Sequence, residues 1–480
     1  MYITQLSNCL SLPEWAERHK EKGIAIEERN GRYYAYRIHS VWDPEKRRSR
    51  KVTDEYLGVV RPEGIIPPKH KRRKEVGPVI EAGNIIYLER FANMLIKPLQ
   101  EFWPESWQSI LAAGVLKLAY REPLKRLSFR YQTSYACRLW PDAHLSKNSL
   151  TSLLEMLGLE WGCQRSFFEE LSRADSNMAI DLTQVFSDSK NISWLEKGYN
   201  HQGSNHEQLQ LLLLWGVDTH LPGFLRLLPG TASSAQNLIN AVVESRLRNV
   251  IVIGDKAFFS TENVDALEFH EVNYALALPR DLEFLEHPPP SRYRRYFLHK
   301  KSPQWWREYE WGERRVVHYL DKQLAAQEEA SFLGRVEQGK AKKKDHREKK
   351  NTFGTLAILT DTGKEPKELY ELYKQRREIE QCFDSLKNTL DADKTWMQSR
   401  EKLQGYLFIL FIAFHIYSQV LLHLHRKELN EKYSVHDVLW YLTKAYIVPV
   451  DGRDIVSENL KSTRKLVAEL EVPITQKLGT

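Results

Sequence analysis

The sequence predicts a multidomain α/β protein whose core is a mixed β-sheet. At 480 residues the chain exceeds one ordinary hydrophobic core, because domains typically hold about 100–200 residues. Apolar runs of strand length recur through the middle of the chain, at residues 178–186, 209–217, 224–228, 250–254 and 274–278. The first three follow one another, with a Leu221-Pro222-Gly223 turn before the third, whereas a helical pattern at 234–248 precedes the fourth. Strands in series followed by strands separated by helices are expected to form a mixed sheet.

A small β-rich module is predicted at the N-terminus, over residues 1–66. Residues 24–60 alternate apolar and polar around Asn30-Gly31, a strong hairpin signal, and a second turn is expected near Asp43-Pro44. Its strands interleave cations with aromatic residues, namely Arg29, Arg32, Arg37, Lys46, Arg47, Arg48, Arg50, Lys51, Tyr33, Tyr34, Tyr36 and Trp42. Such a face either protects a solvated sheet edge by its charge or contacts a polyanion such as DNA. A basic linker follows at 67–79.

Two further regions flank or interrupt the predicted sheet. Helical periodicity dominates residues 80–174, which are expected to form an α-helical domain. Residues 282–361 interrupt the core with a Pro288-Pro289-Pro290 run, many cations and two adjacent tryptophans, and 340–350 is interpreted as a mostly basic loop. We interpret this insertion as a DNA-facing subdomain, with a plain solvated insertion as the alternative. The core is expected to resume with a helix at 366–390.

Composition and charge narrow the class of protein. Hydrophobic residues make up 42% and charged residues 28% of the chain, as in folded soluble proteins, and the net charge of +7 suits a polyanionic partner. The four cysteines form no CxxC pair, so neither a zinc knuckle nor a disulfide framework is supported. The N-terminus lacks the order of a signal peptide. Polar residues such as His415 and Gln419 interrupt the apolar run 407–424, which predicts a buried helix. We therefore expect a cytoplasmic protein with no membrane partner.

Two carboxylates occupy unusual places in the predicted sheet. Asp181 lies within the apolar run 178–186, where an ionised group is costly unless it is paired or binds a cation. Asp255 directly follows the apolar run 250–254, at the carboxyl end of a strand, where open α/β sheets build their sites. A single aspartate after a strand is more often a turn former or a helix cap. Asp188 and Asp218 remain open as alternatives to Asp255.

The third element of the site is a stripe on the helix expected at 366–390. At 100° per residue, Tyr373, Arg376, Glu380 and Lys387 fall within about 60° of one another on one face. Apolar side chains form the adjoining stripe, so the helix is expected to pack on the core with the polar stripe at the edge of the core. Ordinary surface helices carry similar charges as i, i+4 pairs, which is the alternative for the helix taken alone.

Three well-separated carboxylates, Asp181, Asp255 and Glu380, suit metal-dependent phosphoryl transfer. Hard oxygen ligands hold two Mg²⁺ ions roughly 3.5–4 Å apart in such sites, and nearby lysine and arginine hold the phosphate backbone. The sequence contains no HxxxH, GxSxG or P-loop spacing, so no small-molecule cofactor is expected.

These residues resemble a known family. Asp181, Asp255 and Glu380 on a β-β-β-α-β pattern are similar to the catalytic carboxylates of the DDE transposases of bacterial insertion sequences, which have a ribonuclease-H-like core. Tyr373, Arg376, Glu380 and Lys387 fit the Y-x2-R-x3-E-x6-K signature of one large branch at every spacing. The likeness extends over residues 179–417, and an insertion before the glutamate is also a feature of that branch. It further includes Gly198-Tyr199-Asn200, Leu228-Pro229-Gly230 and Gly405-Tyr406-Leu407-Phe408-Ile409. The sequence departs from relatives after Asp255, where Lys256-Ala257 stands in place of Arg or Ala and then Gly.

The resemblance implies a reaction and roles for the site residues. Asp181, Asp255 and Glu380 would bind two Mg²⁺ ions, for which Mn²⁺ can substitute, while Tyr373, Arg376 and Lys387 would contact phosphates near the cleaved end. The implied protein binds the terminal inverted repeats of its element, nicks the ends and joins the 3′ ends to target DNA. It would act as a homodimer or larger synaptic complex at the bacterial nucleoid. In relatives that form hairpins, a tryptophan in the insertion holds a flipped base; Trp305 or Trp306 is the candidate here, beside a core or surface role.

Two other functions are compatible with the pattern. A structure-specific or defence nuclease on the same fold would cut DNA without strand transfer. A domesticated DNA-binding protein would have lost catalysis, although three carboxylates in order argue against it. In the domain organisation that we predict, 80–174 helps to bind DNA ends and 426–480 is a helical region for dimerisation. The predicted boundaries are 1–66, 67–79, 80–174, 175–281, 282–361, 362–425 and 426–480.

Overall fold

The computed structural model describes most of the 480-residue chain. The described residues are 12–68, 76–187, 189–197, 207–230, 235–246, 250–377, 379, 394–395 and 397–474. They divide into two compact units, of which the first comprises Met1–Gly77 with Pro449–Arg453 and the second comprises Pro78–Val448 with Asp454–Thr480.

The first unit contains the strands that were expected within residues 1–66. A short helix, α1 (Glu14–Glu17), precedes an antiparallel sheet in the order β1 (Ile24–Arg29), β2 (Arg32–Asp43), β3 (Arg48–Arg61) and β4 (Gly64–Ile66). Asn30 and Gly31 both adopt positive φ, 52° and 76°, as a tight hairpin turn between right-twisted strands requires. The hairpin predicted at Asn30-Gly31 is therefore confirmed. Its small core is formed by Ala16, Ala35 and Val60.

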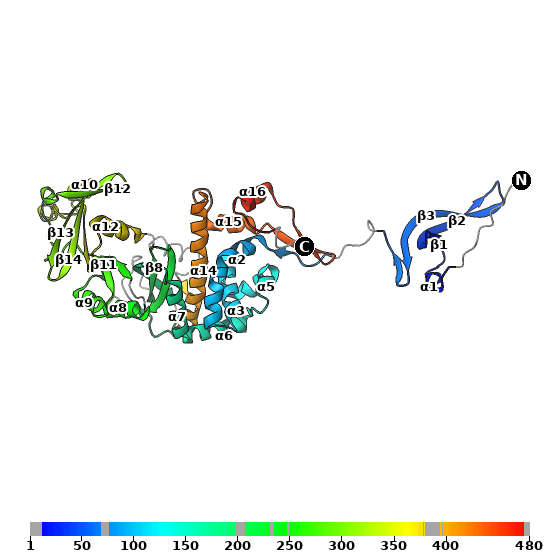
Figure 1. Ribbon diagram of the computed structural model, residues 1–480, viewed down its shortest axis with the longest axis horizontal. Coiled ribbons are helices and arrows are strands. Elements are labelled where there is room, and N and C mark those ends of the chain that lie inside the picture. The colour runs from blue at the N-terminus through cyan, green and yellow to red at the C-terminus, as the bar shows by residue number, and fades with distance from the viewer. Residues whose placement is uncertain are drawn as a thin grey trace. The chain divides into compact units, whose positions relative to one another are not determined.

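A mixed sheet forms the centre of the second unit (Figure 1). β6 (Asn177–Ser187), β8 (Glu207–Gly216) and β9 (Leu221–Leu228) are antiparallel in series, whereas β10 (Ile251–Gly254) runs parallel to β6, and β11 (Asn273–Ala277) runs parallel to β10. In sequence, helix α8 (Ala235–Glu244) lies between β9 and β10, and helix α9 (Thr261–Phe269) lies between β10 and β11. The order β9-β8-β6-β10-β11 is the predicted ribonuclease-H-like arrangement. The two-residue strand β7 (Glu196–Lys197) pairs with β8.

The turn before β9 lies earlier than the sequence predicted. Leu221-Pro222-Gly223 belongs to the strand, and the reversal occupies residues 217–220, where His220 has a φ of 57°. Two aspartates fix this reversal: Asp175 accepts hydrogen bonds from both the N–H and the hydroxyl of Thr219, and Asp218 accepts from the N–H groups of Ser176 and Asn177. These hydrogen bonds stabilise the turn, so it does not need a Pro-Gly sequence.

The predicted helical region is built into the same hydrophobic core as the sheet. The long helix α14 (Arg400–Arg426) packs against β9 and against helices of that region (Figure 1). Gly158 and Gly405 allow α6 (Lys147–Leu159) and α14 to cross closely, because a Cβ atom at either glycine would lie within about 2 Å of a backbone oxygen of the other helix. The helices of the region are α2 (Gly83–Phe102), α3 (Trp107–Tyr120), α4 (Leu127–Thr133), α5 (Ala136–Leu139), α6 (Lys147–Leu159) and α7 (Trp161–Leu171).

Helix α14 is also the segment for which the sequence predicted a buried helix. It is long and apolar enough to cross a membrane by length and composition, but 78% of its most apolar window is buried inside the protein. Burial of this kind is typical of the central helix of a folded core. The prediction of a buried helix is therefore confirmed.

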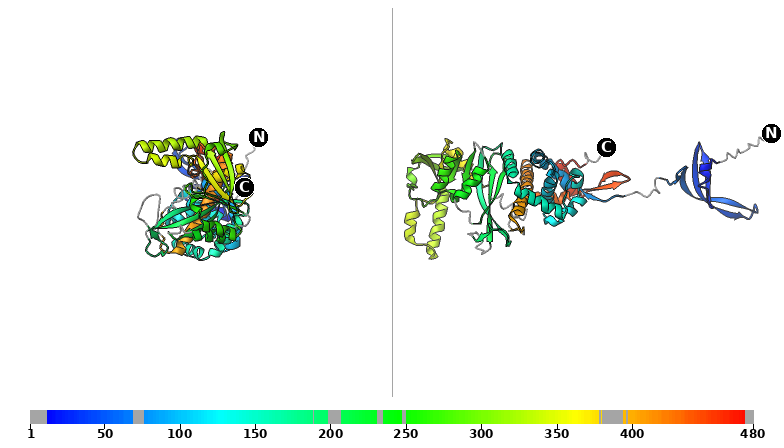
Figure 2. Two further views of the ribbon diagram at one scale, coloured as in Figure 1. Left: turned by 90° about the vertical axis from the view of Figure 1, so that its left-hand side faces the viewer. Right: turned by 90° about the horizontal axis from the view of Figure 1, so that it is seen from below.

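The insertion extends the central sheet. β15 (Thr355–Thr360) pairs with β11, and β14 (Arg314–Asp321), β13 (Ser302–Trp311) and β12 (Arg295–His299) follow in order. Between β14 and β15 the chain forms α10 (Lys322–Glu337) and α11 (Lys343–Lys349), which lie side by side (Figure 2). The prediction of a basic loop at 340–350 is wrong, because the His346 ring packs with Phe332 and Phe353 and binds Glu329 at 2.7 Å, which holds α11 on α10.

The C-terminal region combines helices with two strands. The sequence predicted helices alone, but β17 (Tyr446–Val450) and β18 (Arg453–Val456) lie between α15 (Val435–Leu442) and α16 (Lys461–Glu469). β17 pairs with β5 (Ile80–Glu81), so the end of the chain completes a small sheet with the beginning of the helical region. Dimerisation through residues 426–480 stays a prediction.

Candidate active site

Asp181 and Asp255 occupy matching positions on adjacent parallel strands. β10 pairs with β6 so that Ile253 lies opposite Ala179, and each aspartate follows two residues further along its chain. Asp255 lies just after β10 but keeps an extended backbone, with φ −75° and ψ 169°. Side chains two residues apart share a face, and neighbouring strands lie about 4.8 Å apart. The two carboxylates therefore extend side by side from one face of the sheet.

The backbone that follows each aspartate orients its carboxylate. Oδ1 of Asp181 accepts a hydrogen bond from the N–H of Leu182 at 2.9 Å, and Oδ1 of Asp255 accepts from the N–H of Lys256 at 2.6 Å. Asp255 thereby caps the short 3₁₀ helix Lys256–Phe258. Both aspartates are half-buried. Each carboxylate is thus held in place while it stays accessible from the solvent.

The sheet opens beside Asp181. On one edge, β8 pairs with β6 without interruption and places Leu213 opposite Asp181. On the other edge, β10 pairs with β6 only as far as Ala179, and the next strand, β16 (Lys394–Thr395), pairs at Phe186 and Ser187. Within the described part of the chain, residues 180–185 of β6 have no strand partner on this edge. The opening lies at the carboxyl end of β10, where α/β sheets commonly bind their ligands.

Arg376 faces this opening from the helix that the sequence singled out. It directly follows α12 (Pro366–Gln375), and its Nη2 lies 3.9 Å from Oδ2 of Asp255. Its guanidinium also lies 5.7 Å from the centre of the Tyr373 ring. Arg376 is only 9% exposed, whereas Arg377 is exposed to solvent. Arg376, which fits the spacing of the signature, is therefore the arginine of this pair that lies beside Asp255.

The other two residues of the predicted stripe, Glu380 and Lys387, lie outside the described residues. The apolar flank of the stripe is buried at Leu372 and at Ile379, as expected for a helix that packs on the core. The structure therefore brings together Asp181, Asp255, Tyr373 and Arg376.

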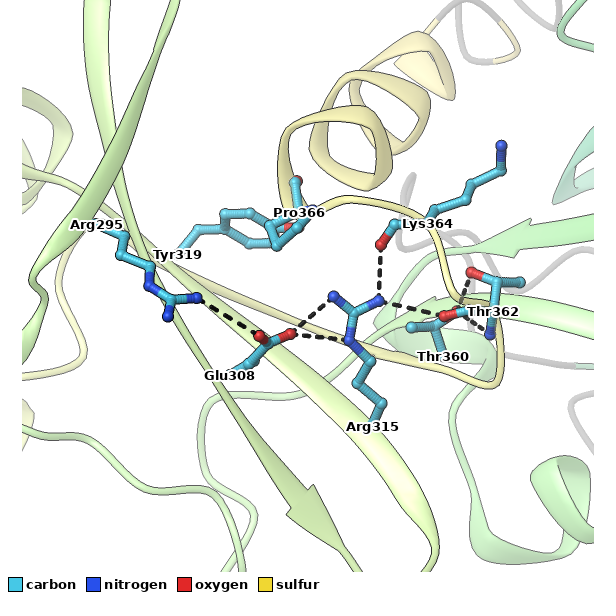
Figure 3. A network of polar contacts seen from close by, with 8 residues as sticks. All are labelled: Arg295, Glu308, Arg315, Tyr319, Thr360, Thr362, Lys364 and Pro366. Carbon is cyan, nitrogen blue, oxygen red and sulfur yellow. Dashed lines mark hydrogen bonds and ion pairs between the residues drawn. The ribbon is translucent and has the colours of Figure 1, made fainter.

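A polar network holds the start of α12 against the insertion (Figure 3). Arg315 on β14 donates to the carbonyl oxygens of Thr362 at 3.2 Å and Lys364 at 2.7 Å, and it pairs with Glu308 on β13 at 2.7 Å. The hydroxyl of Tyr319 donates to the carbonyl of Pro366 at 2.7 Å. These contacts fix the loop between β15 and α12, and thus the direction from which Tyr373 and Arg376 reach the site.

A groove of about 1400 Å³ runs from Asp255 and Tyr373 to helices α10 and α11. Its volume exceeds the roughly 300–1,000 Å³ that is typical of small-molecule pockets. The groove is lined by both charges, including Lys256, Arg280 and Glu328, the last two of which form an ion pair at 2.9 Å. The sequence analysis missed α10 as a wall of this groove. Its one available signal was Asp321, which caps α10.

Trp305 and Trp306 lie on β13 with their side chains on opposite faces of the sheet. Among the described residues that line the groove, neither tryptophan occurs. Nζ of Lys322 lies 3.8 Å from the centre of the Trp305 ring, and the guanidinium of Arg295 lies 5.1 Å from that of Trp306. Both are half-buried, and a base-holding role for either one stays a prediction.

Asp218 and Asp188 were the alternatives to Asp255 as the second carboxylate of the site. Asp218 accepts hydrogen bonds from the N–H groups of Ser176 and Asn177 and from the side-chain amide of Asn177 at the start of β6, where it holds the 217–220 turn. Asp188 lies outside the described residues. Asp255 is therefore the alternative that the structure places beside Asp181.

The donors at this site suit a hard cation. Within the described ranges no three His, Cys, Asp or Glu side chains gather into a metal site, and the third predicted ligand, Glu380, lies beyond those ranges. The two aspartates nevertheless supply carboxylate oxygens on one accessible face, which is the donor chemistry that Mg²⁺ prefers.

The strand order together with matched aspartates on β6 and after β10 defines a ribonuclease-H-like domain of the DDE class. A family model described as a transposase DDE domain matches residues 176–416. This match covers half of the chain, and the chain belongs to that family.

Solved structures and curated proteins were also compared with the chain. It is similar to a piggyBac transposase in a synaptic complex with hairpin DNA, at 10% identity and a TM-score of 0.39, over 85% of each chain. It is also similar to the Mos1 transposase in a paired-end complex with the left transposon end, at 14% identity and a TM-score of 0.16, over 34% of this chain and 57% of that one. A Mos1 mariner paired-end complex with Mn gives 14% identity and a TM-score of 0.15, over 36% and 58%. No curated protein matches the chain.

Proposed function

We propose that this protein is the transposase of an insertion sequence, and that it binds the terminal inverted repeats of the element, cleaves them and joins the 3′ ends to target DNA. The observation that carries the proposal is the placement of Asp181 and Asp255 side by side, with Arg376 3.9 Å from Asp255. Two carboxylates beside a cation suit a phosphodiester, whose charge the cation attracts while the carboxylates hold the metal.

In this proposal Asp181 and Asp255, with Glu380, would hold two Mg²⁺ ions. The chemistry supplied by bound Mg²⁺ is activation of the attacking water or 3′-hydroxyl and stabilisation of the departing oxygen. The N–H groups of Leu182 and Lys256 keep the two carboxylates oriented. Arg376 and Tyr373 position the phosphate next to them, and the groove toward α10 and α11 gives the duplex a path away from the site.

The proposal includes a second copy of the chain. Joining two ends of one element to a single target requires both ends to be held together, so a homodimer or larger synaptic complex is expected. A nuclease on the same fold, which would cut without joining, is the rival function. The family match favours transposition over that rival.

The test of the active site is cleavage of end DNA by the full-length protein in Mg²⁺. The substrate is a duplex that carries the inverted repeat found beside the gene. Asp181→Asn and Asp255→Asn are expected to lower the cleavage rate by about a thousandfold or more, because each removes a ligand charge from the transition state.

Asp281→Asn is the matched control, since Asp281 lines the same groove as Asp255. We expect it to cut within about threefold of the wild type, as no role at the reacting phosphate is assigned to it. Normal cleavage by Asp255→Asn would show that the second carboxylate of the site has been chosen wrongly. EDTA should stop the wild-type reaction, and added Mg²⁺ or Mn²⁺ should restore it.

A further inference from the structure

The β2–β3 hairpin of the first unit extends beyond the small sheet as a two-stranded arm, which we define as residues 38–53. β1 pairs with β2 only as far as Arg37, and β4 pairs with β3 only from Val59 onward. Between these limits β2 and β3 pair with each other alone, from Ile38 opposite Thr53 to Asp43 opposite Arg48. Residues 39–42 and 48–51 are all exposed. The arm therefore has no core on either face.

Positive charge is in excess at the end of this arm, where five cations lie beside two acidic residues, Asp43 and Glu45. Lys46 and Arg47 lie in its turn, and Arg48, Arg50 and Lys51 lie on β3. In the part of the chain that the structure describes, these five side chains form no ion pair. Nearer the sheet the pattern is different, since His39 contacts Asp54 at 2.5 Å and Arg37 approaches Glu55 at 3.9 Å. The cations at the end are thus left for a partner outside the unit.

Apolar side chains accompany the charge. Trp42 is 60% exposed, and Val41 beside it is also exposed. Trp42 lies opposite Ser49, and Val41 lies opposite Arg50, so these two exposed apolar side chains lie on opposite faces of the arm. An exposed aromatic ring among basic side chains is typical of a surface that contacts nucleic acid. In such a contact the ring packs on a sugar or a base edge.

The shape of the arm selects the kind of partner. Two antiparallel strands are about 5 Å apart between backbones and rise about 3.4 Å per residue, so the six residue pairs of the arm extend about 20 Å. The major groove of B-DNA, about 12 Å wide and 8.5 Å deep, admits a ribbon of this kind with phosphates along both rims. Cations on one strand and in the turn can then reach a rim while the faces meet base edges.

We propose that the β2–β3 arm inserts into the major groove of the end DNA, with Arg48, Arg50 and Lys51 on phosphates and Trp42 against a base edge or sugar. This inference rests on the proposed function, because it names the segment through which the transposase recognises its own duplex. The catalytic groove of the second unit would then act on DNA that the arm has already bound.

The experiment measures binding of the full-length protein to the inverted-repeat duplex across a range of NaCl concentrations. The test variants are Arg48→Ala/Arg50→Ala/Lys51→Ala and Trp42→Ala. The matched control is Lys20→Ala/Lys22→Ala/Arg61→Ala, which removes the same charge from exposed positions of the same unit outside the arm. We expect the arm triple variant to bind at least tenfold more weakly at about 0.1 M salt. Its salt slope should fall by about two to three, since each phosphate contact contributes about 0.9.

A second measurement identifies the groove. Methylation of guanine N7, which faces the major groove, should weaken wild-type binding severalfold at specific guanines of the repeat, and the arm triple variant should lose this sensitivity. Equal losses of affinity in the control triple variant, or wild-type affinity and slope in the arm triple variant, would overturn the inference. Thermal melts of every variant show whether the unit remains folded.

Cleavage separates failure of the inference from failure of the proposed function. If the wild type binds and cuts the repeat and the arm triple variant does so equally well, the arm assignment alone is wrong. A wild type that neither binds nor cuts the repeat contradicts both. If the inference holds, the arm triple variant should recover most of the wild-type cutting rate at saturating protein, because its active site is intact.

Discussion

Two regions of this protein are rich in arginine and aromatic residues, the β2–β3 arm and the insertion, and they use their cations differently. On the inner strands of the insertion, arginines meet carboxylates: Arg307 pairs with Glu286 at 2.7 Å, Arg315 with Glu308 at 2.7 Å, and Arg314 with both Asp265 and Glu268. In the described structure, the cations at the end of the arm have no such partners. The insertion uses these charges to hold its strands to one another and to α9 of the core, whereas the arm presents them to the solvent.

A basic and aromatic composition therefore does not by itself identify a nucleic-acid surface. Arg314 has carboxylate partners that lie 46 and 49 residues earlier in the chain, on α9. Arg48 lies directly opposite Asp43 in the strand register, yet the two form no ion pair in the described structure. What separates the two regions is the tertiary position of the carboxylates.

The largest effect expected from this comparison is a loss of stability at acidic pH, caused by a buried histidine of the insertion. His318 on β14 is fully buried against Tyr293, and burial lowers its pKa from 6.5 to about 3. Below pH 6.5 the His318 ring takes up a proton in the unfolded chain but stays neutral in the folded insertion. The contribution of His318 to the free energy of unfolding is therefore fully present above pH 6.5. It should fall by about 1.4 kcal/mol per pH unit between pH 6 and 4. Chemical denaturation at a series of pH values measures the slope.

His318→Gln should remove that part of the slope, whatever its effect on stability at pH 7. His39→Gln is the control from the arm, because His39 is half exposed beside Asp54. An arm variant that changes the acid slope as strongly as the insertion variant would break the contrast between the two regions.

The same contrast occurs within one helical turn, at Arg376 and Arg377. Arg376→Ala is expected to weaken end binding and cleavage by about tenfold to a hundredfold, because it removes the buried cation beside Asp255. Arg377→Ala should stay within about threefold, since its side chain is exposed. Binding titrations and single-turnover cleavage on one duplex compare the two variants directly. A larger loss from Arg377→Ala would reverse the assignment.

A smaller effect is expected from substitution of Arg315, which binds groups within the protein and is not expected to contact DNA. Arg315→Ala should cost about 1 kcal/mol of stability and slow cleavage severalfold, because the loop that leads into α12 loses its anchor. Affinity for DNA should be unchanged. Arg295→Ala is the control: it shares Glu308 at 3.9 Å but is 70% exposed, and such pairs contribute little. Weaker binding with unchanged cleavage would mean that Arg315 contacts DNA after all.

Much of the fold could be predicted because local signals agreed with it. Asn30-Gly31 specified a hairpin, and apolar runs located β6, β8, β9, β10 and β11 of the central sheet. Asp181 and Asp255 stood out because carboxylates beside apolar strands need a reason to be there. Their side-by-side placement follows from parallel pairing of β6 and β10, which the ribonuclease-H-like pattern implied.

The features that were missed depend on contacts distant in sequence. The charged segment 340–350 becomes helical because His346 packs on Phe332 and pairs with Glu329. β17 forms against Ile80 and Glu81, more than 360 positions earlier in the chain. The reversal at 217–220 is fixed by Asp175 from outside the turn. In each case a tertiary partner overrides the local preference of the sequence.

The central claim, that the Asp181 and Asp255 site belongs to a transposase, is tested most directly by strand transfer. Full-length protein is mixed with a precut inverted-repeat duplex that ends in a free 3′-hydroxyl, a supercoiled plasmid and Mg²⁺. We predict covalent joining of the duplex to the plasmid by the wild type and by Asp281→Asn, and none by Asp255→Asn. If the protein cleaves an intact inverted-repeat duplex but gives no joined product with the precut duplex, the claim is contradicted and the protein is a nuclease instead.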